Sequence, residues 1–407
     1  MSLTYEKIGV KRDQLVEALR LGCEWLTDIA QVKTERLTIE SDTKGHRHRY
    51  WRGAIRGEYS VANKTWDFFC PIWHTGQAVK ALTLAHQVLK DKHLIEAANL
   101  GAEFILKESI RDPEDPDYGL ILAYEDLGYG VNTSAILECL DGLINLSEET
   151  GREELWSAAI DALWWVADKA YIDGEGLFKD LYIPDERNFK PPPWGWVKGR
   201  PLLDDGVFLK GYRKTGEEAF RKIFFEVADR LLRDEYPPGN WLRYPPCNPK
   251  TGSIHPRHAY WWGYPMIMAY EETGEEKYLK CAIRAADWYV RAQRVDGGLF
   301  RGTYVDFNTL SFGHATSGIA CATIMWLELT RILGDERYLE PIRKAVNFCM
   351  NMQFRRPEDP NLKGAILEKV LPPNGTDRSP YHIRDLGTIF FIQAAAKLIL
   401  EIERPPR

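Results

Sequence analysis

The sequence contains no long, uninterrupted apolar run, and this absence argues against a membrane protein. No stretch of ~18 apolar residues free of charge occurs, although a helix needs about that length to cross a bilayer. The first residues, MSLTYEKIGVKRD, also lack the apolar core of a signal peptide. We therefore expect a cytoplasmic protein that has no membrane partner.

The sequence also has no excess of positively charged residues. The chain has 53 Lys and Arg residues against 59 Asp and Glu residues, which gives a formal net charge of -6. A surface that binds nucleic acid needs an excess of basic side chains. We therefore expect no nucleic-acid partner.

Cysteine is sparse, with seven residues among 407 and no C-x-x-C spacing. Most of them lie within helical patterns, so we expect buried, reduced thiols. Two close histidine pairs, His46 with His48 and His255 with His258, have no third ligand nearby at a recognisable spacing. No metal site is predicted.

A helical repeat is the strongest pattern that the sequence does contain. Five amphipathic segments begin at residues 92, 153, 218, 276 and 336, which are 61, 65, 58 and 60 residues apart. A period of this length marks a repeat architecture. Each amphipathic segment follows a more uniformly apolar one after a short turn, and a helix that is apolar on most faces is covered on most sides. The apolar segments therefore form an inner ring, and the amphipathic ones lie outside them.

The two ends of the chain complete this pattern. The segment from Asp13 is an amphipathic helix with no apolar partner before it, and the segment from Asp385 is an apolar helix with none after it. Pairing them gives about six hairpins and about twelve helices. We therefore predict an all-α (α/α)6 toroid of six helical hairpins, in one domain that spans residues 1–407 and is closed by its first and last helices.

In such a ring the inner helices point the same way, so their N-termini and the loops before them meet at one mouth. These loops fall in the windows 66–76, 123–134, 199–208, 255–265, 308–318 and 377–387, which hold five of the nine histidines. Helix N-termini and Arg side chains favour negatively charged groups. A hydroxyl-rich, anionic ligand such as a uronic-acid sugar therefore suits the mouth.

Two adjacent carboxylates, Asp204 and Asp205, stand at the start of one inner helix. Hydrolysis of a glycosidic bond uses a carboxylic acid with a raised pKa together with a second carboxylate or a water that it holds. Side chains of neighbouring helical residues diverge by roughly 100°, so one of the two faces the mouth and the other caps the helix. The partner carboxylate comes from another window, where Asp126, Glu125 and Asp67 are the candidates.

Candidate substrate-binding residues come from the same windows and from one basic loop. The mouth supplies His74, His258, Trp262, His314 and Arg384, together with the carboxylates Glu125 and Asp67. In the loop 44–59, an arginine can grip a uronate while Trp51 stacks on a sugar ring. The alternative interpretation makes the carboxylates simple helix caps, His74 and His314 core histidines, and the loop a solvated one.

The stretch LLDDGVFLKGYRKTGEEAF, residues 202–220, resembles the W-x-D-[DT]-x-[FY]-M…G-K-x-T-G-x segment of the unsaturated rhamnogalacturonyl and glucuronyl hydrolases, in the six-hairpin glycosidase group. Leu202 replaces that family's tryptophan, and Trp262 stands at its arginine position. The resemblance implies that Asp204 is the proton donor or holds the water, with Asp205 as support or cap. It also implies that the double bond of an unsaturated sugar is protonated before water attacks, with no metal or organic cofactor.

We therefore predict an enzyme, a glycoside hydrolase that acts on oligosaccharides containing a uronic acid, with Asp204, Asp205 and Asp126 as catalytic residues. Two other reactions remain open. A sugar 2-epimerase needs a histidine pair, for which His258 and His314 are candidates. A uronide lyase needs a base and a cation, which Tyr260 or His258 and Arg384 would supply. A toroid that only binds a sugar or a protein is the non-catalytic alternative.

Overall fold

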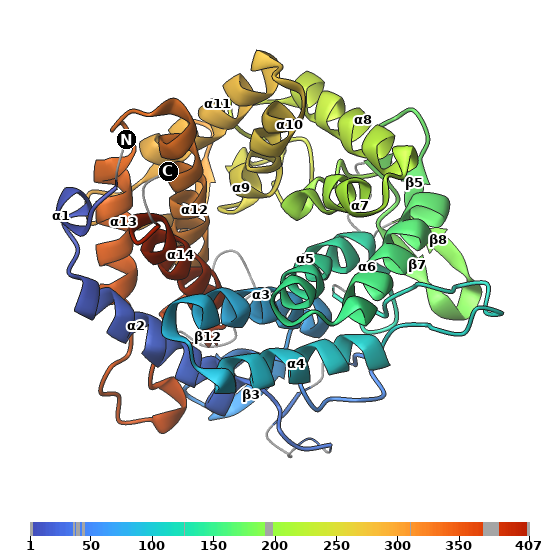
Figure 1. The fold of residues 1–407 in the computed structure, drawn as a ribbon, viewed down its shortest axis with the longest axis horizontal. Helices are drawn as coiled ribbons and strands as arrows, with labels where there is room; N and C mark the ends of the chain where they lie inside the picture. The colour runs from blue at the N-terminus through green and yellow to red at the C-terminus, as the bar shows by residue number, and fades with distance from the viewer. Residues whose placement is uncertain are drawn as a thin grey trace.

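The computed structural model describes residues 3–35, 37, 41–42, 45–125, 127–191, 198–309, 311–368 and 382–404. Two concentric layers of helices form a ring (Figure 1). The inner layer consists of α3 (Pro71–Leu89), α5 (Thr133–Thr150), α7 (Val207–Thr215), α9 (His258–Gly263) with α10 (Pro265–Thr273), α12 (Thr316–Leu333) and α14 (Leu386–Ile402). The predicted (α/α)6 toroid is confirmed.

The outer layer consists of α2 (Arg12–Glu24), α4 (Lys92–Lys107), α6 (Glu153–Trp165), α8 (Glu218–Asp234), α11 (Glu276–Ala292) and α13 (Leu339–Asn351). Two of these helices end in a wider π-helical turn, η1 (Trp25–Ala30) after α2 and η2 (Val166–Ala170) after α6. The last helix, α14, packs against α2 and so closes the ring, while the short α1 (Tyr5–Ile8) packs against α13. No helix of the described residues is long and apolar enough to cross a membrane.

Burial follows the sequence pattern. In the inner helix α3 every residue from 71 to 85 is buried. In the outer helix α11 the buried residues recur at steps of three and four, with Lys280 and Asp287 among those on the other face. The seven cysteines, all of them among the described residues, are buried and form no disulfide bond.

A left-handed residue ends each of the first five inner helices. It is Lys90 after α3 (φ 54°) and a glycine after the others, Gly151, Gly216, Gly274 and Gly334. Glycine is favoured in this conformation because it has no Cβ. Four of the outer helices begin two residues later, which explains the regular period, whereas a turn over residues 335–338 delays the start of α13 to Leu339.

Short strands occupy the longer loops, mostly between an outer helix and the next inner one. One sheet has the order β1 (Ser41–Asp42), β3 (Thr65–Phe68), β2 (Gly57–Ser60) and β12 (His382–Arg384), and a second has the order β11 (Ser311–His314), β10 (Phe300–Tyr304) and β9 (Ser253–Ile254). The others are β4 (Val131–Asn132), β7 (Leu181–Ile183) and β8 (Asn188–Lys190), and the pair β5 (Tyr171–Ile172) and β6 (Leu177–Phe178). Single 3-10 turns occur as η3 (Pro184–Glu186), η4 (Asp204–Gly206) and η5 (Pro360–Leu362).

Ion pairs cross the interior of the ring below the mouth. Lys80 of α3 lies 2.7 Å from a carboxylate oxygen of Asp141 on α5 and 2.7 Å from one of Asp205 on η4. Asp141 also binds Lys210 of α7. Lys80, Asp141 and Asp205 are all buried, so the two charged lysines and two carboxylates satisfy one another away from water. We call these four residues the ion network.

Candidate active site

Asp204 and Asp205 do not lie in the inner helix that follows them. They form the separate turn η4, and α7 begins at Val207. Asp205 and Gly206 both have left-handed backbones, with φ of 51° and 63°, and neither aspartate makes a capping hydrogen bond. A Cβ on Gly206 would meet the Sδ of Met268 at 2.5 Å, so the turn depends on glycine there. This turn directs the carboxyl groups of Asp204 and Asp205 toward different neighbours.

Asp205 belongs to the ion network. It accepts hydrogen bonds from Gln77 Nε2 at 2.8 Å and from Lys80 Nζ at 2.7 Å. Both donors come from α3, so these bonds tie η4 to an inner helix that lies two places away in the ring. Both carboxylate oxygens of Asp205 are therefore engaged inside the protein, and the residue does not cap α7.

Asp204 is the second carboxyl group of the turn. It is 3% exposed, and its Oδ2 has no hydrogen-bond partner in the described part of the chain. Burial raises the pKa of Asp204 to about 7, and the positive charge of Arg200 opposes this shift. A carboxyl group with a pKa near 7 still carries a proton at neutral pH that it can give to a substrate.

Glu138 of α5 is a buried carboxyl group near Asp204. It is 5% exposed, and burial raises its pKa well above the ordinary value, as do the negative charges of Asp204 and Glu125. Glu125 in turn accepts a hydrogen bond from Ser134 Oγ at 3.3 Å. Carboxyl groups that crowd one another in this way disfavour full ionisation. We call Asp204, Glu138 and Glu125 the acidic group.

Arg200 neutralises part of this acidic group. Its backbone forms an antiparallel bridge with Phe178, which fixes it just before η4. Its Nη1 donates to Asp180 Oδ2 at 2.7 Å and to Ser134 Oγ at 3.1 Å. Part of the guanidinium is therefore already bound within the protein, and its positive charge lowers the pKa of Asp204 and that of Glu138.

Three arginines from other loops form a cationic group, namely Arg257 before α9, Arg301 on β10 and Arg384 on β12. Arg384 Nε donates to Glu58 Oε1 at 2.6 Å, and Arg257 Nη1 lies 3.5 Å from Glu368 Oε1. Arg301 Nη1 is buried without a hydrogen-bond partner in the described residues, and removal from water together with Arg384 and Arg257 lowers the pKa of Arg301 to about 9. Three guanidinium groups thus share two carboxylates, so the cationic group has an excess positive charge that a bound anion would neutralise.

Electrostatic interactions join the acidic and cationic groups. The pKa of Glu138 is raised by burial and by Asp204, and it is lowered by Arg257. Most of these residues lie in, or just before, the N-terminal half of an inner helix, whereas Arg301 lies on β10, further from α12. The electrostatic interactions therefore link a buried carboxyl group with a raised pKa to a set of arginines.

Aromatic rings surround Arg257. Its guanidinium lies 5.3 Å from the ring centre of Trp73 and 5.1 Å from that of Trp261. His255 stacks on Trp261 with ring centres 4.8 Å apart and an angle of 6°. Trp262, the predicted substrate-binding residue, is fully buried against His258, with ring centres 4.0 Å apart. Its side chain also lowers the pKa of Asp204 through a hydrogen bond, so Trp262 lies beside that carboxyl group.

The predicted histidines have different neighbours. His74 Nδ1 lies 2.9 Å from Asp385 Oδ2, and its Nε2 has no hydrogen-bond partner in the described residues. His258 Nδ1 lies 2.8 Å from Cys247 Sγ. His314 Nδ1 accepts from Arg294 at 3.1 Å, and its ring contacts Phe348 of the outer helix α13.

The other predicted residues lie as follows. Asp67 is buried on β3, where its backbone is paired with that of Glu58. Trp51 is buried against Phe68, with ring centres 4.5 Å apart, and so anchors its loop in the core. Asp126 lies outside the described residues.

Several residues of the site were not predicted from the sequence. These are Glu58, Glu138, Arg200, Arg257, Arg301 and Glu368. Glu138 could have been found, because a carboxylate is unusual in the N-terminal half of an inner helix that is buried on most sides. The others come from loops and strands, where no periodic pattern indicates which side chains turn inward.

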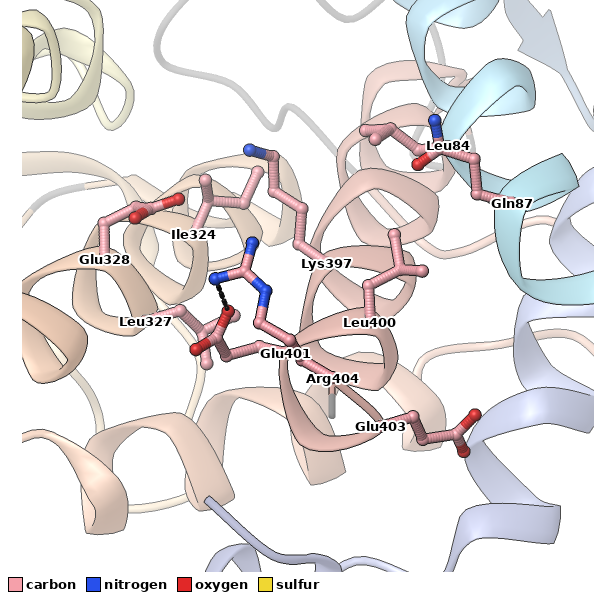
Figure 2. A pocket seen from close by; sticks show the side chains of 10 residues that line it. All are labelled: Leu84, Gln87, Ile324, Leu327, Glu328, Lys397, Leu400, Glu401, Glu403 and Arg404. Atoms are coloured by element: carbon pink, nitrogen blue, oxygen red, sulfur yellow. Dashed lines mark ion pairs between the residues drawn. The ribbon is translucent and has the colours of Figure 1, made fainter. Parts of the chain in front are cut away.

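A separate cavity of about 470 Å³ lies at the opposite ends of the inner helices (Figure 2). It is lined by Leu84 and Gln87 of α3, by Ile324, Leu327 and Glu328 of α12 and by residues of α14, and Glu401 pairs with Arg404 at 3.4 Å. None of the predicted site residues lines this cavity. It is distinct from the acidic and cationic groups.

No family model matches the sequence, and comparison with curated proteins finds no significant match. Solved structures, however, match along nearly the whole chain. An unsaturated glucuronyl hydrolase specific for heparin is similar with a TM-score of 0.68 and 13% identity over 97% of this chain and 99% of that one. The unsaturated glucuronyl hydrolase from Bacillus sp. GL1 has a TM-score of 0.68 and 15% identity over 96% and 97% of the two chains.

Sugar epimerases share the same architecture. The cellobiose 2-epimerase from Spirochaeta thermophila matches with a TM-score of 0.64 and 14% identity over 95% of this chain and 98% of that one. Identities this low establish the fold and leave the reaction to be argued from the site. The chain therefore has the (α/α)6 fold of the six-hairpin glycosidases and of the related sugar epimerases.

Proposed function

We propose that the protein is a glycoside hydrolase that removes a uronic acid, in its unsaturated form, from an oligosaccharide. The observation that carries this proposal is Asp204. It is a buried carboxyl group with a pKa of about 7 and an oxygen without a partner in the described residues, and electrostatic interactions link its acidic group to three buried or half-buried arginines. This combination provides a proton and a binding site for a carboxylate.

The cationic group would hold the carboxylate of the uronate. A guanidinium binds a carboxylate through two parallel N–H···O bonds, and Arg301 has a buried N–H without a partner in the described residues. Arg257 and Arg384 already bind carboxylates of the protein, so they add positive charge and hold their loops in place. Arg257 also has a buried Nε without a partner in the described residues, but its Nη1 is held by Ser317 and Glu368. We therefore assign Arg301 to the substrate.

Asp204 would supply the proton. In an unsaturated uronate the carbon–carbon double bond accepts this proton, a water molecule then adds to the resulting cation, and the water's surplus proton returns to the carboxylate of Asp204. The hydrated sugar then rearranges and releases the rest of the oligosaccharide. Burial and Arg200 set the pKa of Asp204, and Asp205 holds the turn that carries it.

The test uses an unsaturated uronyl disaccharide, whose conjugated double bond absorbs in the ultraviolet. The wild-type protein should remove this absorbance, and Asp204→Asn should lower kcat at least 100-fold, as expected for loss of a general acid. Asp173→Asn is the matched control, because Asp173 is largely exposed on the outer surface and pairs only with Lys222 among the residues described. Retention of more than a tenth of kcat in Asp204→Asn would refute the assignment.

A sugar 2-epimerase is the second candidate, and one observation favours it. His74 Nδ1 faces Asp385, which leaves Nε2 as a buried nitrogen without a partner in the described residues and able to accept a proton. An epimerase would exchange the hydrogen on carbon 2 of a reducing sugar such as cellobiose with solvent deuterium. Exchange that survives Asp204→Asn and is abolished in His74→Gln would replace the hydrolase proposal with this one.

The lyase alternative is less well supported by the geometry. Tyr260, its candidate base, is buried in the core and stacked on Tyr264, with ring centres 5.1 Å apart. Burial and the negative charge of Asp205 raise the pKa of Tyr260 well above its ordinary value. A phenol in this environment is a poor acceptor of protons from a substrate.

A further inference from the structure

Two buried side-chain amides connect the last inner helix to the turn that carries Asp204. Gln393 of α14 is 0% exposed and Gln77 of α3 is 2% exposed. Gln393 Nε2 donates to Gln77 Oε1 at 3.0 Å and to the backbone carbonyl of Gln77 at 3.1 Å. Gln77 Nε2 in turn donates to Asp205 Oδ2 at 2.8 Å and to the backbone carbonyl of Glu138 at 2.7 Å. We call Gln393 and Gln77 the amide pair.

The neighbours of each amide fix its orientation. The carboxylate of Asp205 and a backbone carbonyl accept hydrogen bonds and donate none, so the NH2 group of Gln77 must face them. Its oxygen then faces Gln393, which turns its own NH2 group toward two oxygens of Gln77. A reversed amide at either position would set oxygen against oxygen, and a buried acceptor without a donor is costly. The amide pair therefore has one favourable arrangement.

Close packing of α3 and α5 brings Gln77 to Glu138. A Cβ on Gly76 of α3 would meet the Cα of Cys139 on α5 at 2.4 Å. A Cβ on Gly142 of α5 would meet the backbone oxygen of Gly76 at 2.0 Å. Glycine at both positions therefore allows the two helix backbones to approach each other. Gln77 and Glu138 are the chain neighbours of Gly76 and Cys139, so the amide of Gln77 reaches from one helix to the other.

The Gln77 amide joins the two elements that carry crowded carboxyl groups. One of its bonds holds η4 through Asp205, the chain neighbour of Asp204, and the other holds α5 at the backbone of Glu138. The negative charge of Asp204 acts on Glu138. The separation of two such groups decides how strongly each holds its proton. A side chain that fixes η4 against α5 therefore fixes this separation.

We propose that Gln77 is a positioning residue for the reaction of Asp204, and that Gln393 holds the Gln77 amide in the orientation this requires. The proposal rests on the proposed function, and it adds two residues that act through η4 and α5. Gln393 lies on α14, the helix that closes the ring against α2. The last helix of the chain thus contributes to the geometry of the site.

The experiment separates positioning from substrate binding. Gln77→Met removes the amide and keeps the length of the side chain, and Gln393→Leu removes the donor that orients Gln77. With an unsaturated uronyl disaccharide, kcat should fall about 100-fold in Gln77→Met and about tenfold in Gln393→Leu, because a small displacement of a reacting group costs this much. KM should change by less than about threefold, since Arg301 is untouched. An unchanged kcat in Gln77→Met overturns the proposal.

Gln353→Leu is the matched control for the loss of a buried glutamine. The Gln353 side chain donates to the backbone carbonyls of Ala18 and Gly364 at 2.8 and 3.1 Å, and it bonds neither η4 nor α5 among the described residues. This variant should lose stability and keep kcat within about threefold of the wild-type value. A fall in kcat as large as that of Gln77→Met would assign the effect to lost stability and overturn the proposal.

The pH profile is a readout that a merely structural role would not move. The charged groups that act on Asp204 or respond to it, namely Arg200, Asp205 and Glu138, are present in every variant. A turn released from Gln77 admits water to Asp204, so the pH above which kcat/KM declines should fall by about one unit in Gln77→Met. A profile that keeps its wild-type position contradicts the proposal.

If the wild-type protein leaves the disaccharide unchanged, the proposed function fails, and the amide pair is tested without a substrate. Asp204→Asn removes the contribution of a buried carboxyl group to the pH dependence of the unfolding free energy. Urea unfolding measures this contribution in the wild-type background and in Gln77→Met. It should be smaller in Gln77→Met, where Asp204 is less well shielded from water, and a contribution of equal size in both backgrounds refutes the role of Gln77.

Discussion

Asp204→Asn is expected to change the pH dependence of stability as well as activity. The folded protein holds the proton of Asp204 up to a pH of about 7, whereas an unfolded chain releases it near the ordinary value of 3.8. Between these two pH values unfolding releases a proton, so raising the pH favours the unfolded state. The asparagine side chain does not titrate, and this part of the pH dependence disappears in the variant.

The magnitude follows from the shift. The folded and ordinary values differ by about three pKa units, and each unit corresponds to about 1.4 kcal/mol. Relative to wild type, the free energy of unfolding of Asp204→Asn should therefore rise by on the order of 4 kcal/mol between pH 4 and pH 8. The variant gains because the wild-type protein must keep a buried carboxylate ionised at the higher pH.

Urea unfolding of both proteins at a series of pH values measures this difference. Other titrating groups are common to the two proteins, so they cancel in the comparison, except for Glu138, whose pKa falls when the charge of Asp204 is removed. A difference in unfolding free energy that stays constant from pH 4 to pH 8 would refute the reasoning, because it would mean that Asp204 has the same pKa in the folded and unfolded chain. The same measurement on Asp173→Asn controls for the loss of a carboxylate.

Three further outcomes are expected. Asp205→Asn should lower the free energy of unfolding by about 3 kcal/mol in urea titrations, because it leaves Lys80 in the ring with one carboxylate fewer. Lys90→Gly should raise the thermal midpoint of unfolding, because a left-handed backbone costs a non-glycine residue roughly 1 kcal/mol. Gly151→Ala should lower the midpoint by a similar amount for the same reason, although a Cβ at position 151 meets no atom within 4 Å. Arg301→Met should raise KM for an unsaturated uronyl disaccharide at least tenfold and change kcat less, and an unchanged KM would remove Arg301 from the substrate site.

The helical layout was predictable because it depends on local patterns. A period near 60 residues, amphipathic outer segments and a glycine at most inner-helix ends are all visible in the sequence, and they place the helices correctly. The start of α13 was predicted too early, since residues 335–338 form a turn that the helical pattern does not reveal.

The site was only partly predictable, because its geometry depends on backbone turns and distant loops. The expectation that Asp204 and Asp205 begin a helix was wrong, and the left-handed backbone of Asp205 is the reason. That turn sends one carboxyl group to the ion network and leaves the other with the acidic group. Arg301 and Glu368 interact electrostatically although they come from loops that are far apart in the chain, and no spacing in the sequence links them.

The ion network has a consequence for how the ring can move. Its lysines and carboxylates join three consecutive inner helices, α3, α5 and α7, and the turn η4. Sliding one of these elements past another would separate the buried charge of Lys80 from its carboxylates, which is strongly unfavourable. The three helices and the turn that carries Asp204 should therefore move as one unit.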